Sequence, residues 1–273
     1  MKATTAIGIG VAFVCLLLGV IMEGGNPMAY FNIPAAIVIG GGTMGALIAS
    51  LDMDSVKKLP KLAILAFKGG NAAPDMKGAM KQMVGLAEKA RRDGLLALED
   101  DLGAIEDEFT RRGLQLVVDG VESDLVISIL QAESDGMAQR HARNAKMFMT
   151  AGGFAPTIGV LGTVLSLVHV LENLSNPANL GHAIAGAFLA TLYGVGSANI
   201  LFLPIANRLK ELSTDEQAYR SMLLEAVLSI QAGDNPRMLA EKLETFVAPS
   251  QRGEEAEAKE GAAGGQAAAA QAA

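Results

Sequence analysis

Two threonines, Thr163 and Thr191, lie inside long apolar stretches of the sequence. A threonine hydroxyl carries one donor and two acceptor lone pairs, so its oxygen can coordinate a cation or hold a water beside a carboxylate supplied by another chain. The alternative is a hydroxyl that donates back to a carbonyl of its own helix, which is the more common arrangement. In these stretches Thr163 and Thr191 are the side chains whose chemistry best suits a cation.

Two prolines, Pro156 and Pro204, lie in the same apolar stretches. Proline has no N–H, so Pro156 cannot donate to the carbonyl of Gly152 and Pro204 cannot donate to that of Ile200. In an apolar medium each freed carbonyl needs a neighbouring helix, a side chain or water. Each proline is therefore expected at a kink that faces protein or a wet cavity, and a proline merely tolerated in a membrane helix is the alternative.

The residues just described belong to four apolar stretches that come in two pairs. Spans one to four cover about residues 4–22, 33–51, 148–171 and 183–205. A helix that crosses a bilayer needs about 20 predominantly apolar residues, so each stretch is predicted to be a transmembrane helix. Span one is too long for the apolar region of a signal peptide and no small-x-small cleavage site follows it, so we interpret it as a retained helix.

Small residues accompany the hydroxyls in these spans. Gly40, Gly41, Gly42 and Gly45 recur along span two. Small residues let membrane helices approach closely. This stripe is therefore predicted to contact a neighbouring helix.

The basic residues of the chain determine its orientation in the membrane. Of the 22 Lys and Arg residues, one precedes span one, fourteen fall in 52–147 and seven in 206–273, with none in 23–33 or 172–182. The positive-inside rule places both termini and the large loop on the cytoplasmic side of the membrane. We predict an all-α membrane protein with four transmembrane helices, a helical cytoplasmic domain between spans two and three, and a cytoplasmic C-terminal helix.

The spans contain no Asp, Glu, Lys or Arg away from their ends. A protein that moves ions across a membrane usually places an ionisable side chain at depth. Either this chain conducts nothing, or a partner supplies the carboxylate.

Composition argues against several other classes of protein. Hydrophobic residues make up 51% of the chain and the net charge is -7, so no basic field is available to gather nucleic acid. Cys15 is the single cysteine and the three histidines are scattered, which argues against a disulfide, a metal site or a bound cofactor. No nucleophile, acid and base can be grouped into a catalytic site, so an enzyme is disfavoured.

The polar segments are predicted to be helical. Apolar residues recur at helical spacing in 74–92, after which Asp93 and Gly94 break the pattern, and the same spacing resumes in 95–116. A further helix is expected from about residue 125 into span three, and two more cover 208–230 and 235–246. We divide the chain into 1–51, 52–147, 148–205, 206–252 and a disordered, low-complexity tail at 253–273.

Charges of both signs flank the break at Asp93 and Gly94. Arg91 and Arg92 precede it, and Glu99 and Asp100 follow it. A solvated charged face would explain them, because surface ion pairs contribute only about 0–1 kcal/mol. A docking surface that binds and releases a partner is the functional alternative.

Several local patterns together resemble the MotA/PomA subunit of the bacterial flagellar stator. They read APTIGVLGTV at 155–164, ATLYG at 190–194, PIANRL at 204–209, ARRDGLLALE at 90–99, and NPR at 235–237 followed by EKL at 241–243. The resemblance runs in order from the first span to about residue 252, and the low-complexity tail lies outside it.

This resemblance implies a partner and an assembly. In the family, the subunit surrounds the membrane helix of a MotB/PomB-type subunit whose aspartate carries the ion, and five copies form a ring around two partner helices. Ion passage then drives rotation of the ring against the rotor switch protein of the flagellar motor, and membrane lipid surrounds the assembly.

The resemblance also assigns roles to single residues. Pro156 and Pro204 match the family's two essential prolines. Thr163 and Thr191 line the ion path. Sodium-type members tend to have a second threonine where this chain has Ala190, which favours protons over sodium.

For the rotor, the resemblance assigns Arg91 or Arg92 together with Glu99 and Asp100 as the residues that meet the switch protein. Two alternatives to a stator subunit remain. An ExbB/TolQ-type subunit energises an outer-membrane process, but such proteins usually have three spans and an external N-terminus. A non-conducting membrane scaffold would use its threonines only for packing.

Overall fold

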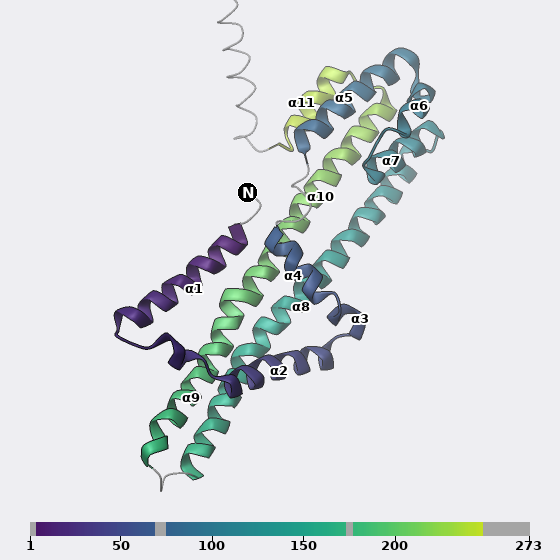
Figure 1. Ribbon diagram of the computed structural model, residues 1–273. Coiled ribbons are helices and arrows are strands. Elements are labelled where there is room, and N and C mark those ends of the chain that lie inside the picture. Colours follow the sequence, from purple (N-terminus) through teal and green to yellow (C-terminus); the bar gives the residue numbers. More distant parts are fainter. Residues whose placement is uncertain (1–3, 69–74, 173–176, 248–273) are drawn as a thin grey trace, which may run out of the picture. The chain divides into compact units, whose positions relative to one another are not determined.

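The computed structural model describes residues 4–68, 75–172 and 177–247, and every regular element among them is a helix (Figure 1). The tail at 253–273, for which disorder is predicted, lies outside the described residues. In chain order the elements are α1 (Thr4–Met22), a 3-10 turn η1 (Pro27–Tyr30), α2 (Ile33–Ser50), α3 (Met53–Val56), α4 (Leu59–Lys68), α5 (Met76–Asp93), a 3-10 turn η2 (Leu95–Leu98), α6 (Glu99–Leu102), α7 (Glu108–Val118), α8 (Ser123–Glu172), α9 (Pro177–Gly196), a π-helical segment η3 (Ser197–Phe202), α10 (Leu203–Ala232) and α11 (Pro236–Glu244).

Four helical stretches in the described part of the chain are long and apolar enough to cross a membrane. They are Thr4–Met22, Pro27–Ser50, Ser123–Glu172 and Ala183–Ala232. The predicted all-α fold with four transmembrane helices is therefore confirmed. The last two stretches have 50 residues each, more than the roughly 20 that a bilayer requires, so each continues well beyond its apolar part.

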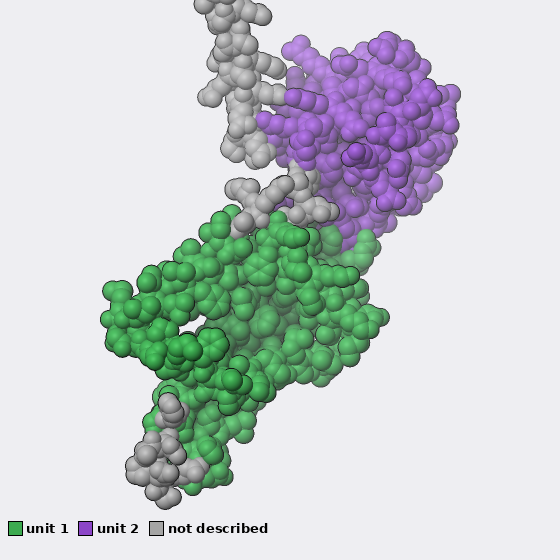
Figure 2. Space-filling view, in the orientation of Figure 1, with its two compact units in different colours: residues 1–73, 138–214 green, residues 74–137, 215–273 purple. Residues whose placement is uncertain are grey.

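The chain forms two compact units, coloured separately in Figure 2. Unit 1 comprises 1–73 and 138–214, and unit 2 comprises 74–137 and 215–273. The predicted segments 1–51, 52–147, 148–205 and 206–252 are divided at the ends of the spans. The limits of the two units lie outside the spans instead, because polar residues next to the spans belong to unit 1.

The reason for this difference is a hydrophobic cluster in unit 1. The helices α3 and α4 contribute Val56, Leu59 and Ala66, which pack with Phe148 of α8 and Leu209 of α10. Residues that follow span two are thus tied to the spans by burial of apolar side chains, which is worth about 25 cal/mol per Å² removed from water.

Close packing of α8 against α9 depends on two glycines of unit 1. A Cβ added at Gly194 would lie 2.5 Å from the carbonyl oxygen of Ala155 and 2.9 Å from the Cα of Gly159, and one added at Gly159 would lie 3.1 Å from the carbonyl oxygen of Ala190. The two backbones therefore approach each other more closely than any side chain would permit, as small residues allow in membrane bundles.

The predicted glycine stripe of α2 is only partly a contact. Among its members Gly42 meets the side chain of Ile158, whereas an added Cβ at Gly40, Gly41 or Gly45 would meet nothing within 4 Å. The buried positions of α2 are instead Ala35, Ile39, Thr43 and Leu47, spaced four apart. A four-residue spacing follows one side of an α-helix, and three of the four glycines lie off that side.

Unit 2 contains the amphipathic helices. Asp75 caps α5, which ends at Asp93 before Gly94, whose φ of 89° is a conformation that glycine adopts readily. The break predicted here is confirmed. Asn235 likewise caps α11 by accepting from the N–H of Arg237.

The expected continuous helix over 95–116 is wrong, because this segment divides into η2, α6 and α7. Asp107 begins a new helix by accepting from the N–H of Thr110 at 2.6 Å. The apolar residues nevertheless share one core, in which Leu98, Leu102 and Phe109 are all buried. Their spacing correctly identified the inward side chains but did not reveal the turn between them.

Replacing Gly194 with alanine is expected to destabilise unit 1. The added methyl would overlap backbone atoms of α8 that cannot move aside, and overpacking of this kind typically costs about 1–3 kcal/mol. Gly196→Ala is the matched control, since a Cβ there meets nothing within 4 Å. The thermal unfolding midpoint of the purified protein should fall for Gly194→Ala and stay unchanged or rise for Gly196→Ala; equal midpoints would contradict the close contact.

Candidate functional site

The structure brings Thr163 of α8 and Thr191 of α9 together. Their hydroxyl oxygens are 2.5 Å apart, and Thr163 Oγ1 is also 3.0 Å from the carbonyl oxygens of Gly159 and Ala187. Thr163 carries a single hydroxyl hydrogen, so it donates to only one of these neighbours at a time. Four oxygens thus gather at a partly buried point between two membrane-spanning helices.

The positions of these oxygens follow from the helix packing. Gly159 is four residues before Thr163 and Gly194 is three residues after Thr191, so both threonines lie beside the close contact of α8 and α9. Thr163 and Thr191 could not reach each other if larger residues held the helices apart. The alternative arrangement, in which a threonine hydroxyl contacts a carbonyl of its own helix, is also present. Thr163 Oγ1 lies within hydrogen-bonding distance of the Gly159 carbonyl four residues earlier, as well as of Thr191.

The prolines lie away from the threonine pair. Pro156 is half-buried inside α8, which continues on both sides of it, about 10 Å along the helix from Thr163. Gly152, whose carbonyl lacks the N–H of Pro156, is buried against Phe202 and Leu203. This packing involves apolar side chains, and the partner expected for the Gly152 carbonyl stays a prediction.

Pro204 lies two residues after the last residue of the π-helical segment η3. In this segment the N–H of Leu203 donates to the carbonyl of Ala198, five residues earlier. π turns are rare and occur often at functional sites. Pro204 also lines a cavity of about 620 Å³ in unit 1, together with Asn199, Asn207 and Arg208.

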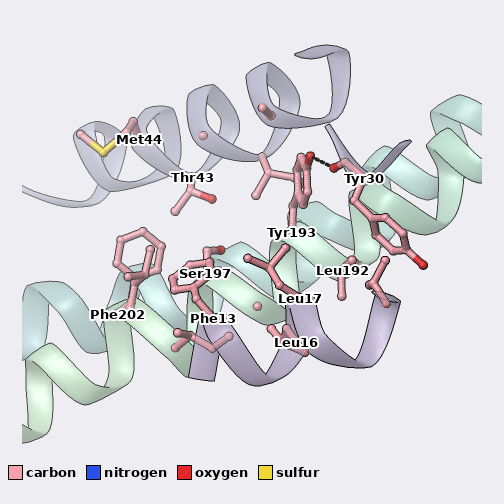
Figure 3. Close-up of a pocket in the computed structure, with 17 residues that line it drawn as sticks. Phe13, Leu16, Leu17, Tyr30, Thr43, Met44, Leu192, Tyr193, Ser197 and Phe202 are labelled. Carbon is pink, nitrogen blue, oxygen red and sulfur yellow. Dashed lines mark hydrogen bonds between the residues drawn. The ribbon is translucent and has the colours of Figure 1, made fainter. Parts of the chain in front are cut away.

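Tyr193 ties α9 to the segment that precedes α2. Its hydroxyl donates to the carbonyl oxygen of Tyr30 and accepts from the N–H of Asn32 at 3.0 Å, and Figure 3 shows the first of these bonds. Asn32 in turn caps α2, because its Oδ1 accepts from the N–H of Ala35 at 2.9 Å. One side of α9 is thus bonded to α8 at Thr191, and another is bonded to the chain entering α2.

The four residues assigned to the rotor lie together in unit 2. Arg91 and Arg92 are exposed at the end of α5, and Glu99 and Asp100 are exposed at the start of α6. A salt bridge of 2.8 Å between Lys89 of α5 and Asp101 of α6 joins the two elements. Exposed side chains of both charge signs therefore lie on two elements that a salt bridge joins.

Arg92 is partly engaged within the chain. It forms a salt bridge of 2.9 Å with Asp93, which lowers the pKa of the Asp93 carboxyl below its usual value, and the same hydrogen bonds raise the pKa of the Arg92 guanidinium. Arg91 is the neighbouring exposed cation of this surface. Among the described residues no group of three His, Cys, Asp or Glu side chains could hold a metal ion.

Comparison with known proteins gives a consistent result over the described fold. Residues 6–94 match the description "Motility protein A N-terminal", and residues 102–222 match the "MotA/TolQ/ExbB proton channel family". Motility protein A of Borreliella burgdorferi is 37% identical over 252 residues, covering 92% of this chain and 96% of the relative. Motility protein A of Bacillus subtilis is 36% identical over 264 residues, covering 96% and 97%.

The chain belongs to the motility protein A family. Solved structures agree with this assignment. A chain of the flagellar MotAB stator complex from Bacillus subtilis superimposes with a TM-score of 0.87 at 36% identity, covering 93% of this chain and 99% of that chain. A chain of C. jejuni MotAB has a TM-score of 0.86 at 30% identity, covering 91% and 97%.

Family membership bears on the alternatives. The match over 102–222 is shared by MotA, TolQ and ExbB proteins, but the match over 6–94 is described for motility protein A alone. The hypotheses of an ExbB/TolQ-type subunit and of a non-conducting membrane scaffold are therefore not favoured. The family is one of motor and channel subunits, and its proton channel description supports ion transport across a membrane.

Sequence reasoning missed two features of this chain. The π-helical segment contains no glycine or proline, so only Pro204, two residues after its end, indicates a departure from α-helical geometry. The bonds of Tyr193 to Tyr30 and Asn32 join residues more than 160 positions apart, which no local pattern reveals. In the sequence Tyr193 is distinguished only by a hydroxyl within an apolar span.

Removing the hydroxyl of Tyr193 is expected to loosen α9 from α2. Tyr193→Phe removes the partner of the Tyr30 carbonyl and of the Asn32 N–H, and a typical intramolecular hydrogen bond contributes about 0.5–1.5 kcal/mol to stability. Tyr30→Phe is the matched control, because Tyr30 participates through its backbone. The thermal unfolding midpoint should fall only for Tyr193→Phe, and a drop of similar size in both variants would refute the assignment.

Proposed function

We propose that this chain is the ion-conducting stator subunit of a bacterial flagellar motor, coupling proton flow through a complex with a MotB/PomB-type subunit to rotation of the rotor. The observation that carries the proposal is the oxygen cluster at Thr163 and Thr191, set between membrane-spanning helices that contain no charged side chain at depth. Hydroxyl and carbonyl oxygens suit a hydrated proton or a small cation, but they cannot carry a proton across the membrane by titration.

The missing titratable group is what calls for a partner. A membrane aspartate on a MotB/PomB-type subunit would supply the carboxylate, and the threonine oxygens would hold water or the ion beside it. The structural neighbours are described as MotAB complexes, which supports a partner of this kind and an assembly of several copies. We infer a homopentamer around two partner helices, as the family resemblance implies.

The transported ion is proposed to be H⁺, with Na⁺ as the alternative. Ala190 offers no hydroxyl beside Thr191, so the cluster has one oxygen fewer than a sodium site with a second threonine would have. Sodium binding needs several oxygen ligands to replace its water, whereas a proton can pass along hydrogen-bonded hydroxyls and water. Pro156 and Pro204 are proposed to shape the two helices along this path.

The exposed charges at Arg91, Arg92, Glu99 and Asp100 are proposed to meet the rotor switch protein. Their position on adjoining elements of unit 2 supports this role, because complementary charges steer fast and reversible association. This assignment places unit 2, both termini and the C-terminal helices in the cytoplasm, with the spans in the inner membrane surrounded by lipid.

Thr191→Val is expected to abolish or strongly reduce torque while leaving partner binding intact. Valine keeps the branched shape and removes only the oxygen that lies 2.5 Å from Thr163 Oγ1. Thr150→Val is the matched control, since Thr150 Oγ1 bonds only to the Lys146 carbonyl of its own helix. Swimming speed and co-purification of the partner measure the two effects. Normal swimming with Thr191→Val would remove this residue from the ion path.

Reversing both arginines, Arg91→Glu with Arg92→Glu, is expected to abolish rotation without lowering the amount of protein in the membrane. Exposed ion pairs contribute only about 0–1 kcal/mol to folding, so the fold should survive. Lys77→Glu with Lys81→Glu changes the same charge on the same helix, near its other end, and serves as the control. Rotation of tethered cells and immunoblots of membranes measure the two effects. Unchanged rotation in the charge-reversed variant would show that the two arginines are solvated charges with no docking role.

A further inference from the structure

The helix α1 borders two cavities of unit 1 and has no buried residue among those described. Thr5 and Ile9 line one cavity, and Phe13 and Leu17 line the other. These four positions are spaced four apart, a spacing that follows one side of an α-helix. One continuous side of α1 therefore faces open space within unit 1, and Figure 2 shows a gap in this unit beside α1.

The cavity at the start of α1 is polar. Its volume is about 620 Å³, and Thr4 and Thr5 of α1 line it together with Asn207, Arg208 and Glu211 of α10. The proposed topology places this end of the spans at the cytoplasmic side of the membrane. Pockets that contain a basic side chain between membrane helices on this side bind the headgroups of phospholipids.

Arg208 has one donor that the chain leaves unused. Its Nη1 donates to Glu211 Oε2 at 2.6 Å, whereas its Nε is buried and has no hydrogen-bond partner among the described residues. A buried donor on a charged group is costly to leave unpaired. A phosphate oxygen suits this donor, because the guanidinium group forms strong charge-assisted hydrogen bonds with phosphate.

The polar cavity offers charges of both signs. The side chain of Glu211 is 63% exposed, so its carboxylate remains accessible beside Arg208. A headgroup with a phosphate and a primary ammonium matches this pair, since the phosphate accepts from Arg208 and the ammonium donates to Glu211. A headgroup with net negative charge would instead place part of that charge near the carboxylate.

The second cavity is apolar and is drawn in Figure 3. Its volume is about 520 Å³, and side chains such as Phe13, Leu17, Ile39, Met44 and Phe202 form its wall. Water leaves apolar cavities dry, and an unfilled space forfeits the dispersion contacts of the atoms around it. Inside a bilayer such a space is expected to hold a hydrocarbon chain.

The two cavities adjoin each other. Ile200 lines both, and on α1 the last residue of the polar cavity, Ala12, directly precedes Phe13 of the apolar one. From Thr5 to Leu17 the helix rises about 18 Å, at about 1.5 Å per residue. One leaflet of the hydrocarbon core is about 15 Å deep. The polar and apolar parts therefore follow each other over the depth of a single lipid molecule.

We propose that a phosphatidylethanolamine of the cytoplasmic leaflet binds between α1 and the rest of unit 1. Its phosphate binds Arg208 Nε, its ammonium binds Glu211, and one acyl chain fills the apolar cavity. The lipid is thereby the packing partner of a helix that buries no side chain of its own. The leaflet follows from the proposed topology, whereas the binding itself does not depend on ion transport.

The test uses the chain purified with its partner in detergent and titrated with phosphatidylethanolamine, phosphatidylglycerol or phosphatidylcholine. Native mass spectrometry reports how many lipids stay on the intact complex at each concentration. We expect phosphatidylethanolamine to bind most tightly. Equal apparent affinities for the three lipids, tighter binding of phosphatidylglycerol, or no retained lipid would overturn the proposal.

Two substitutions address the headgroup. Arg208→Gln removes the phosphate ligand and is expected to weaken phosphatidylethanolamine binding about tenfold, since a hydrogen bond to a charged group is among the strongest in proteins. Lys210→Gln is the matched control, because Lys210 is exposed on the same helix and does not line the cavity. Glu211→Gln should abolish the preference over phosphatidylglycerol. An equal effect of Arg208→Gln and Lys210→Gln, or an unchanged preference in Glu211→Gln, would contradict this headgroup site.

The apolar cavity is tested by filling it. Gly40 lines this cavity and Gly41 does not, and an added Cβ at either position meets nothing within 4 Å. Gly40→Leu is expected to weaken phosphatidylethanolamine binding about tenfold through lost burial of the chain, and Gly41→Leu to leave it unchanged. Equal affinities of the two variants would overturn the acyl-chain site. Dissociation of the oligomer in Gly40→Leu alone, with no loss of lipid from the remaining complexes, would show that a neighbouring copy fills the cavity and would overturn it too.

Lipid binding is measured here without ion flow. A chain that drove no ion-dependent swimming with its partner would contradict the proposed function and leave these affinities unchanged. Loss of the lipid site, with swimming intact, would contradict only the inference about α1.

Discussion

The close approach of α8 and α9 at Gly159 and Gly194 is the constraint on which the rest of the membrane unit depends. At this contact an added Cβ would overlap backbone atoms, so the separation of the two helices is set by the main chain itself. Lipid tails give no hydrophobic drive for helices to associate, and tight packing with interhelical hydrogen bonds replaces it. The bond between Thr163 and Thr191 and the bond from Thr163 to Ala187 both form within that narrow gap.

The distribution of charge along the chain also follows from the properties of the lipid bilayer. An uncompensated charge at the bilayer centre is costly, and this chain avoids it by keeping every Lys, Arg, Asp and Glu near or beyond the ends of its spans. Its ionic chemistry is concentrated in unit 2, where Arg220 bridges Glu133 and also lies 4.9 Å from the ring centroid of Phe109. The spans of unit 1 therefore offer oxygens without charge, and unit 2 offers charge on an exposed surface.

Much of this organisation could be predicted from the sequence because its physical signals are local. The first span was predicted at 4–22 and α1 has those bounds, since hydrophobic length alone decides such a helix. The break at Gly94 was also predictable, because a glycine after paired arginines ends the pattern of α5. The charges of Arg91, Arg92, Glu99 and Asp100 could be singled out from the sequence, but the sequence does not reveal the Lys89 to Asp101 salt bridge that joins their two elements.

What could not be predicted depends on partners distant in the chain. The 2.5 Å contact of Thr163 with Thr191 joins two helices whose rotation about their axes is set by packing, and Asp107 starts α7 where an unbroken apolar spacing favoured one long helix. Within this chain only Gly42 of the four predicted α2 glycines meets a neighbouring helix, for the same reason. Spacing shows which residues share a side of a helix, but the neighbouring helix decides which side is used.

The π-helical segment between α9 and α10 has a consequence for the geometry of the contact with α8. Gly194 meets Ala155 and Gly159 of α8, and Leu203 meets Gly152 of the same helix. At about 100° per residue, an uninterrupted α-helix would turn through about 180° between positions nine apart and would point Leu203 away from α8. The wider turn of η3 takes up about one additional residue and brings Leu203 back toward that helix. The number of residues between Gly194 and Leu203, more than their identity, is thus the quantity that this part of the chain must keep.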